Sequence, residues 1–370
     1  MVLIACSPIP NDGEPAMKIA FFQDLSVPDS LDLVSPSFLA FETVMQRQVV
    51  EAKGIAVEVV QLDTAGDAEV AAEMAREVAT DSTFVLAVIA PFWQEPPEVA
   101  RILAEAGLPT MSLSPESASP WLEASAPPGD PAELWRRFVP DREAQIELLA
   151  EVAGRSSSGD AAQQVCLVSD GSGYSEELST GVEAALSPLP STPVDGADAV
   201  AAADQLASLH CGSVVWTGFP LEARELAEAI REGDPERAQP IDLASDALKT
   251  VMPPMTPDGE RVVVESVVCP CADVSVDTDL ESRTFVNTYQ SEHGLAPGAY
   301  AVEAWDAGSL VAEALASGTA TRTDMRTALA AITTFDGVAH DYAFDSDGEP
   351  IGVGPAQFAA AGTRWVPLPS

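Results

Sequence analysis

Apolar and polar positions along the chain follow two different periods. Short apolar runs rich in Val, Ile and Phe alternate with segments whose apolar residues recur every three to four positions. The first pattern is typical of parallel strands buried on both faces, and the second is typical of amphipathic helices. A first series predicts strands at 17–25, 56–64, 83–91 and 109–115. A second series predicts strands at 163–170, 212–219, 239–247 and 261–268.

The segments between the predicted strands have the pattern of crossover helices. In residues 67–79, Val70, Met74 and Val78 fall on one helical face while glutamates occupy another. Crossovers between parallel strands are almost always right-handed, so each series predicts a sheet with helices on both faces. We therefore predict an α/β chain with two doubly wound parallel-sheet lobes. A cleft between two such lobes is a natural place to bind a small molecule.

Length and charge restrict the class of protein. A chain of 370 residues can bury two sizeable cores. Its 58 acidic residues against 18 basic ones give a formal net charge of −40. Such a surface repels nucleic acid and anionic lipid, so we expect no nucleic-acid partner. We interpret the charge as an adaptation to saline surroundings or a consequence of a high-GC genome; a specific cationic partner is the alternative.

The N-terminal residues 1–16 contain a second signal. The sequence Leu3-Ile4-Ala5-Cys6-Ser7 resembles a bacterial lipobox, and a polar tether follows it up to the first strand. Only five residues precede Cys6, whereas an export signal needs an apolar segment of about 7 to 15 residues. Two interpretations stay open. Either the true start lies upstream and Cys6 is lipidated, which predicts an extracytoplasmic protein held to the membrane by a lipid anchor alone, or the resemblance is chance.

Four further cysteines bear on the compartment and on metal binding. Cys166, Cys211, Cys269 and Cys271 allow three full pairings in an oxidising compartment. Cys166 and Cys211 stand at the starts of consecutive predicted strands and can meet; the alternative is that both are small buried hydrophobic residues. The one-residue spacing between Cys269 and Cys271 is not that of a zinc site, so we expect no metal.

Sequence motifs that would indicate catalysis are missing. The sequence contains neither G-x-x-x-x-G-K-[ST] nor G-x-S-x-G, and Gly171-Ser172-Gly173 lacks the third glycine of G-x-G-x-x-G. We therefore expect a binding protein with no catalytic residue and no cofactor. An enzyme that uses the cleft is the less favoured alternative.

The C-terminal third carries several short motifs in a recognisable order. They are F-x-x-x-Y at 285–289, W-D-A at 305–307, F-D-G-V at 335–338 and F-D-x-D-G at 344–348. In this order the chain, over residues 17–370, resembles the leucine/isoleucine/valine-binding family of ABC importers, whose members have the type I periplasmic-binding fold. No single motif would carry the resemblance alone.

The resemblance implies that the chain crosses between the lobes three times. Lobe 1 then combines 17–138 with 270–340, and lobe 2 combines 139–269 with 341–370. Three segments joining the lobes form a hinge that can close around a ligand. The family also implies the partners: a small-molecule ligand and an ABC permease. A ligand sensor of the same fold, which presents its closed form to a receptor, is the alternative function.

Site residues follow from the resemblance by position. In the family, hydroxyls and backbone amides after the third and fourth strands bind the ligand's carboxylate, while a tyrosine and an acidic side chain of lobe 2 meet its ammonium. The corresponding ligand-binding residues here are Trp93, Gln94, Ser114, Ser117, Tyr174 and Asp246.

Some loop residues depart from the family pattern. Ala118 stands where relatives have a threonine, and Glu95 and Glu116 bring negative charge toward the place of a ligand carboxylate. We therefore expect an amino acid or a related amine or amide as ligand, with Trp93 able to stack on a ring or a cation. The alternative is that Trp93 packs on the lobe surface and both glutamates face solvent.

Overall fold

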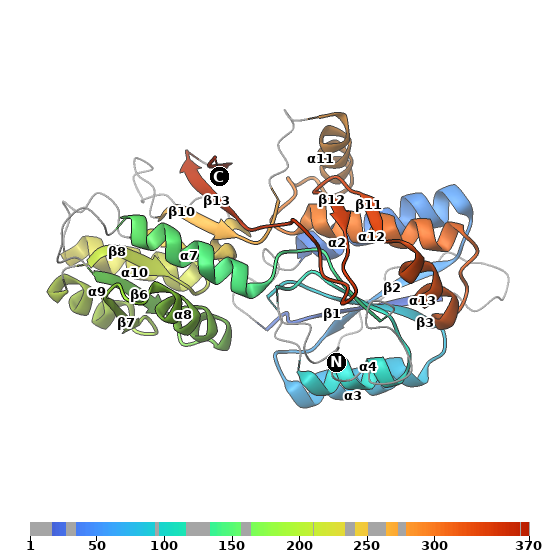
Figure 1. Cartoon of the computed structure of the whole chain (residues 1–370), viewed down its shortest axis with the longest axis horizontal. Helices are drawn as coiled ribbons and strands as arrows, with labels where there is room; N and C mark the ends of the chain where they lie inside the picture. Colours follow the sequence, from blue (N-terminus) through green and yellow to red (C-terminus); the bar gives the residue numbers. More distant parts are fainter. Residues whose placement is uncertain are drawn as a thin grey trace. The chain divides into compact units, whose positions relative to one another are not determined.

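The fold is known from a computed structural model of the chain. It describes residues 17–26, 35–92, 96–115, 134–156, 164–209, 211–233, 241–250, 264–272, 279–362 and 364–369. Figure 1 shows the chain coloured along its sequence. The predicted ligand residues Trp93, Gln94 and Ser117 and the predicted lipidation residue Cys6 lie outside the described residues.

The chain divides into two compact units, each built from separate segments. The first unit comprises Met1–Pro140 and Val274–Val353, and the second comprises Asp141–Asp273 and Gly354–Ser370. The sequence-based expectation assigned residues 341–353 to the second lobe, whereas the structure places them in the first unit. The reason is local: 341–343 form a strand that pairs antiparallel with 334–336, so this hairpin stays with the first unit.

The first unit is built on a five-stranded sheet in the order β2-β1-β3-β4-β5, with all pairings parallel. Its strands are β1 (Met17–Gln23), β2 (Val57–Asp63), β3 (Phe84–Ile89), β4 (Thr110–Ser112) and β5 (Trp135–Arg137). Its other elements are α2 (Ser35–Val44), η1 (Met45–Glu51), α3 (Ala68–Thr80), α4 (Pro97–Glu105), α11 (Leu280–His293), α12 (Ala301–Ala316), α13 (Arg322–Ala331), β11 (Thr334–Asp336) and β12 (Asp341–Ala343).

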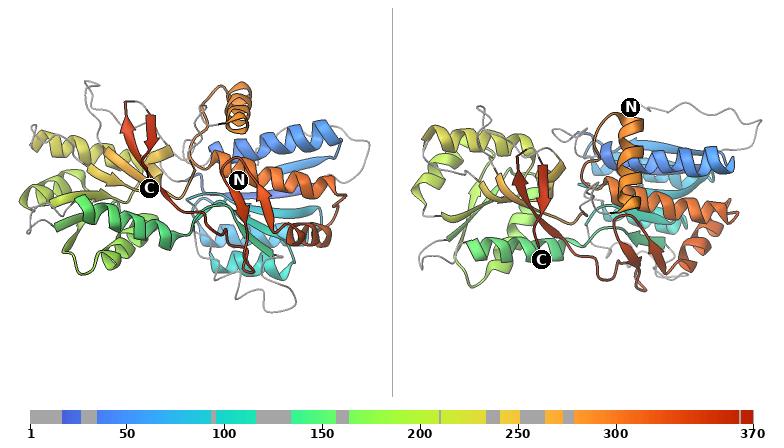
Figure 2. Two further views of the ribbon diagram at one scale, coloured as in Figure 1. Left: turned by 45° about the horizontal axis from the view of Figure 1, so that its top comes forward. Right: turned by 90° about the horizontal axis from the view of Figure 1, so that it is seen from above.

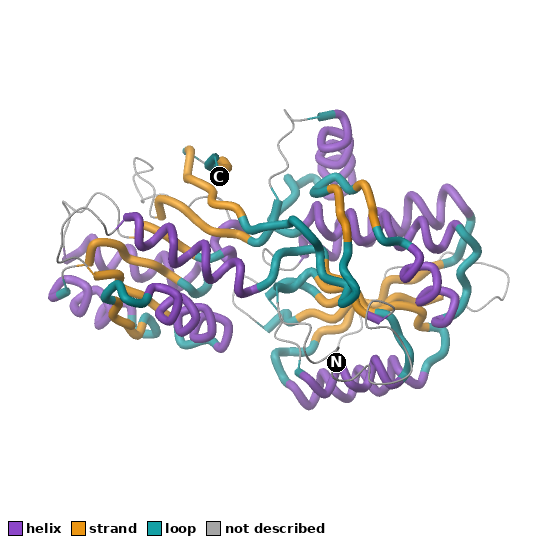
Figure 3. The backbone as a smooth tube through the Cα atoms, in the orientation of Figure 1, coloured by secondary structure: helices purple, strands orange, loops and turns teal. Residues whose placement is uncertain are grey.

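Helices cover both faces of this sheet. Phe21 of β1 contacts Phe38 and Phe41 of α2, with ring centroids 5.3 and 5.9 Å apart. Its neighbour Phe22 points the other way and belongs to the buried cluster formed with α3 and α4. Figures 1 and 3 show α2 and α12 on one side of the strands and α3 and α4 on the other.

The second unit is built on a seven-stranded sheet in the order β14-β13-β10-β9-β8-β6-β7. The parallel strands are β6 (Gln164–Ser169), β7 (Ser191–Asp195), β8 (Cys211–Trp216), β9 (Ile241–Ala244) and β10 (Val264–Cys269). The strands β13 (Ala356–Ala361) and β14 (Arg364–Pro367) add to its edge in antiparallel pairing. The helices are α7 (Arg142–Ser156), α8 (Gly173–Leu186), α9 (Ala199–Ser208), α10 (Pro220–Gly233) and the short η2 (Asp246–Thr250).

Helices also lie on both faces of the second sheet. Figure 2 shows α7 and α8 on one side of the strands and α9 and α10 on the other. Parallel strands joined by helical crossovers, with helices on both faces, confirm the predicted α/β class in both units. Among the described residues, six strands were not predicted from the apolar pattern, namely β5, β7, β11, β12, β13 and β14.

Two disulfides lie within the second unit. Cys166 of β6 is bonded to Cys211 of the adjacent strand β8, with Cα atoms 5.7 Å apart. Cys269 at the end of β10 is bonded to Cys271. The sequence left open whether Cys166 and Cys211 pair or are merely buried; in the structure they are paired.

A buried carboxyl in the first unit gives a pH-dependent stability. Asp306 of α12 is 1% exposed and accepts hydrogen bonds from the backbone amides of Val338 and Ala339, each 2.7 Å long. Burial, together with a smaller contribution from Glu303 one turn earlier, raises the pKa of Asp306 to about 8 despite the opposing effect of these amide donors.

We expect this group to stabilise the fold in acid. Between about pH 4 and pH 8 the native state holds a proton that the unfolded chain has released, so the free energy of unfolding falls as pH rises. The contribution of Asp306 is fully present below its unfolded pKa and is lost as pH rises through about 8. The substitution Asp306→Asn removes this titration. Urea unfolding at several pH values should give a flatter pH dependence for Asp306→Asn than for the wild type; parallel curves would contradict the assignment.

Candidate functional site: a buried polar cluster at the sheet edge

Three loops of the second unit meet at one edge of its sheet. The strands β6, β8 and β9 are adjacent and parallel, so the residues that follow them lie along the same carboxyl edge. Tyr174 is in the first turn of α8 after β6, Phe219 follows β8, and Asp246 follows β9. Parallel topology therefore brings together residues more than 70 positions apart in the sequence.

Asp246 is the centre of this group and is fully buried. The hydroxyl of Tyr174 donates a hydrogen bond to its Oδ1 at 2.6 Å, and Nε2 of Gln145 donates to the same oxygen. Nη1 of Arg142 donates to Oε1 of Gln145 at 2.8 Å. The guanidinium of Arg142 also lies over the ring of Tyr174, 5.1 Å from its centroid. We call Arg142, Gln145, Tyr174 and Asp246 the Asp246 cluster.

The electrostatics of the Asp246 cluster keep the tyrosine neutral. Burial raises the pKa of Tyr174 well above its ordinary value, and the negative charge of Asp246 raises it further. Tyr174 therefore remains a hydrogen-bond donor throughout the physiological pH range. The cluster also contains one positive and one negative side chain, Arg142 and Asp246, linked through the amide of Gln145. Opposite charges in one buried network lower the cost of desolvating each.

Loop contacts around the cluster hold it in place. The ring of Phe219 stacks on Tyr174 with centroids 5.3 Å apart and an interplanar angle of 28°. Asp170 accepts hydrogen bonds from the backbone amides of Ser172 at 2.9 Å and Phe219 at 2.8 Å, which ties the loop after β6 to the loop after β8. Behind them, the hydroxyls of Ser175 and Thr217 lie 2.9 Å apart. The side chains at this edge are thus positioned by hydrogen bonds between loops.

The structure brings together two of the residues expected from the sequence and adds two that were missed. Tyr174 and Asp246 are joined directly by a hydrogen bond. Arg142 and Gln145 were missed because they lie in the first turn of a helix, α7, and not in a loop that follows a strand. The sequence does contain one signal for these two residues: Arg142 and Gln145 fall just after residue 139, where the second lobe was expected to begin.

Ser114 lies in the other unit, where it follows β4. It is fully buried, and its backbone amide donates to Oγ of Ser112 at 3.1 Å. Its own Oγ has no hydrogen-bond partner among the residues that the structure describes. The remaining expected ligand residues, Trp93, Gln94 and Ser117, stay predictions.

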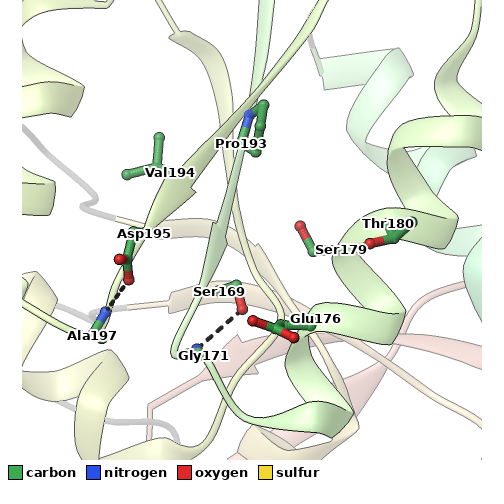
Figure 4. Close-up of a pocket in the computed structure, with 9 residues that line it drawn as sticks. All are labelled: Ser169, Gly171, Glu176, Ser179, Thr180, Pro193, Val194, Asp195 and Ala197. Atoms are coloured by element: carbon green, nitrogen blue, oxygen red, sulfur yellow. Dashed lines mark hydrogen bonds between the residues drawn. The ribbon is translucent and has the colours of Figure 1, made fainter.

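A separate cavity of about 500 Å³ opens beside α8 and β7 (Figure 4). Its lining includes Ser169, Glu176, Ser179 and Asp195 but no member of the Asp246 cluster. Asp195 accepts a hydrogen bond from the amide of Ala197 at 3.0 Å, and Ser169 accepts one from the amide of Gly171 at 3.1 Å. Both side chains accept hydrogen bonds from backbone amides of their own loops. The cavity is therefore a weaker candidate for the binding site than the Asp246 cluster.

In the described ranges, His, Cys, Asp and Glu side chains form no group of three or more that is suited to hold a metal ion. Of the helices in the same ranges, none combines the length and the apolar character that a bilayer crossing requires.

Comparison with solved structures gives the same fold. The branched-chain amino acid transporter substrate-binding protein LivJ from Streptococcus pneumoniae, in complex with isoleucine, is 15% identical with a TM-score of 0.72, over 95% of this chain and 99% of that chain. The leucine-binding protein LivK from Thermotoga maritima is 18% identical with a TM-score of 0.71, over 96% and 98%. A solute-binding protein of an ABC transporter from R. palustris, in complex with benzoate, is 15% identical with a TM-score of 0.70, over 95% of each chain.

Sequence comparison gives the family. No curated protein matches the chain. A family model for periplasmic binding proteins matches residues 16–361, which is nearly the whole sequence. Its range covers both units and every residue of the Asp246 cluster. The chain therefore belongs to the periplasmic binding protein family.

Proposed function

We propose that the protein is the extracytoplasmic solute-binding component of an ABC importer and binds an amino acid or a related amine or amide. The observation that carries the proposal is the buried carboxylate of Asp246, held by Tyr174 and Gln145 at the carboxyl edge of a parallel sheet. Ligands of open α/β sheets bind at this edge. An ionised carboxylate only accepts hydrogen bonds, so a ligand ammonium is the kind of donor that it binds.

The family supports a function in binding rather than in catalysis. The similar structures include proteins in complex with isoleucine and with benzoate. These two ligands share a carboxylate and differ in the rest of the molecule. The carboxylate of Asp246 favours a ligand that carries an ammonium group, and therefore favours an amino acid over an aromatic acid such as benzoate. The permease partner and the lipid anchor at Cys6 remain predictions, the first from the family and the second from the sequence.

A thermal-shift screen tests the proposal. The purified protein is heated with amino acids, amides, polyamines, short peptides and benzoate, each in excess. A ligand present at 100 times its dissociation constant should stabilise the native state by about 2.7 kcal/mol. We expect at least one amino acid, amine or amide to raise the melting temperature, while benzoate does not. The proposal fails if none of these amino compounds shifts the melting temperature, or if the protein instead turns over ester or peptide substrates.

Replacing the carboxylate of Asp246 should weaken ligand binding. We expect Asp246→Asn to raise the dissociation constant of a cationic or zwitterionic ligand about tenfold, because a desolvated charge pair is lost. Asp204→Asn is a matched control, since it makes the same chemical change on the exposed face of α9. Isothermal titration of both variants measures the effect. Equal affinity in the wild type and Asp246→Asn would remove Asp246 from the ligand site.

A further inference from the structure

The first unit contains a buried side-chain amide that no other described residue satisfies. Gln23 is the last residue of β1 and is fully buried. Its backbone oxygen accepts hydrogen bonds from the amide of Thr64 at 2.8 Å and from the hydroxyl of Thr64 at 3.1 Å. By contrast, neither Oε1 nor Nε2 of the Gln23 side chain has a hydrogen-bond partner in the part of the chain that the structure describes.

An unpaired buried amide lowers the stability of the fold. Side chains alternate between the faces of a strand, so Gln23 shares its face with Ile19 and Phe21, which are both apolar and fully buried. A buried amide without partners is destabilising, and an apolar side chain of similar shape would remove that cost. The described part of the fold therefore gives no reason for a glutamine at this position.

A second unsatisfied group lies at the same edge of the sheet. Ser114 follows β4 and is fully buried, and its hydroxyl is likewise without a partner among the described residues. The strands β1 and β4 flank β3 on either side, and all three are parallel. Gln23 and Ser114 thus stand at the carboxyl ends of strands on both sides of β3, the edge where α/β sheets bind ligands.

An aromatic pair lies at the end of β3, the strand between β1 and β4. Ala90 donates its amide to the oxygen of Phe22 at 2.9 Å, which fixes the end of β3 beside the end of β1. Phe92 follows, with a φ of 63°, and its ring contacts Tyr300 at 5.4 Å between centroids. Tyr300 also has a φ of 63° and precedes α12. Two bulky residues with positive φ in contact are uncommon, and such backbone strain concentrates at functional sites.

We propose that Gln23 is a specificity-determining residue that contacts a neutral polar group of the ligand, with Ser114 as a second polar contact at the same edge of the sheet. This inference rests on the proposed function and narrows its ligand class. A carboxamide satisfies both polar atoms of Gln23, because each amide donates one hydrogen bond and accepts one. A carboxylate accepts from Nε2 but leaves Oε1 facing negative charge, and an alkyl group satisfies neither. The structure thus favours a carboxamide amino acid over an acidic or aliphatic one.

Isothermal titration with three ligands of similar size tests this selection. The wild type is titrated with L-glutamine, L-glutamate and L-leucine, and we expect glutamine to bind at least tenfold more tightly than the other two. Gln23→Met keeps the length of the side chain and removes both polar atoms. We expect it to weaken glutamine binding about ten- to hundredfold, to leave leucine binding equal or tighter, and not to lower the melting temperature of the ligand-free protein.

Two further variants test whether a change in glutamine binding is specific to the proposed ligand residues. Ser114→Ala should also weaken glutamine binding, and it serves as an independent test if Gln23→Met does not fold. Thr110→Val is the matched control, because Thr110 is a buried residue at the other end of β4 whose hydroxyl also lacks a partner among the described residues. Thr110→Val should leave the dissociation constants of all three ligands unchanged.

The outcomes separate this inference from the proposed function. If leucine binds the wild type as tightly as glutamine, and Gln23→Met changes neither affinity, the inference is overturned while the proposed function stands. If glutamine binding is unchanged in both Gln23→Met and Ser114→Ala, the inference is overturned as well. If the wild type binds none of the three ligands, this inference is overturned, while the proposed function is decided by the wider thermal-shift screen.

Discussion

Removal of the disulfide between Cys166 and Cys211 is expected to lower the free energy of unfolding by about 4 kcal/mol. The two cysteines are 45 positions apart in sequence, and the loop that they close contains α8, β7 and α9. In the chain-entropy model the cross-link limits the freedom of the unfolded chain, and the effect grows with the logarithm of the loop length. The double substitution of both cysteines by alanine makes this change.

The second disulfide of the same unit provides a matched control. Cys269 and Cys271 are only two positions apart, so the same model gives about 1.5 kcal/mol for their removal. Urea unfolding of both double variants, and of the wild type with and without a reducing agent, measures the difference. An equal loss of stability in both variants would show that loop closure is not the source of the stabilisation.

Replacement of Arg322 by methionine is expected to lower the free energy of unfolding by about 3 kcal/mol. The guanidinium, in the first turn of α13, donates hydrogen bonds to five backbone oxygens of the first unit, those of Val78, Ala79, Asp81, Phe84 and Ala106. These oxygens belong to the C-terminal ends of α3 and α4 and to the start of β3. Carbonyls at helix ends have no partner within the helix, and a positive charge there is favourable.

The chain offers two comparisons for Arg322→Met. Arg322→Lys keeps the charge but loses the planar fork of donors, so we expect an intermediate loss of stability. Arg283→Met removes an exposed arginine of α11 whose Nε donates to the backbone oxygen of Asp279, and it should change the free energy of unfolding by less than about 0.5 kcal/mol. Urea unfolding of all three variants gives the ranking. A value for Arg322→Met no larger than that for Arg283→Met would contradict the role assigned to Arg322.

Long apolar strands and amphipathic helices made most of the fold predictable. Strands such as β3, which is buried along its whole length, have an unambiguous pattern. The missed strands lack it for physical reasons. The edge strand β7 contains Pro193 and only one buried residue, and an edge position tolerates both features. The short strand β5 consists of Trp135 and two arginines, and its burial comes from tertiary contacts rather than from apolar character.

The site was only partly predictable. Tyr174 and Asp246 could be expected because the resemblance to the family implies ligand residues at these positions, in loops that follow parallel strands. Gln145 could not be expected, since its contact with Asp246 spans 101 positions and depends on how α7 packs on the sheet. Gln23 is visible in the sequence only as a polar residue at the end of an apolar strand. The reason to propose it as a ligand residue appears only once its burial is known, together with the absence of a side-chain partner among the described residues.

We expect each chain to bind one small amino acid, amine or amide beside Asp246, at the carboxyl edge of the sheet in the second unit. Isothermal titration of the wild type with the compound that gives the largest thermal shift tests it most directly. We expect saturable binding of one ligand per chain, with the dissociation constant raised about tenfold in Asp246→Asn and unchanged in Asp204→Asn. Absence of saturable binding, or equal binding by the wild type and Asp246→Asn, would contradict the account.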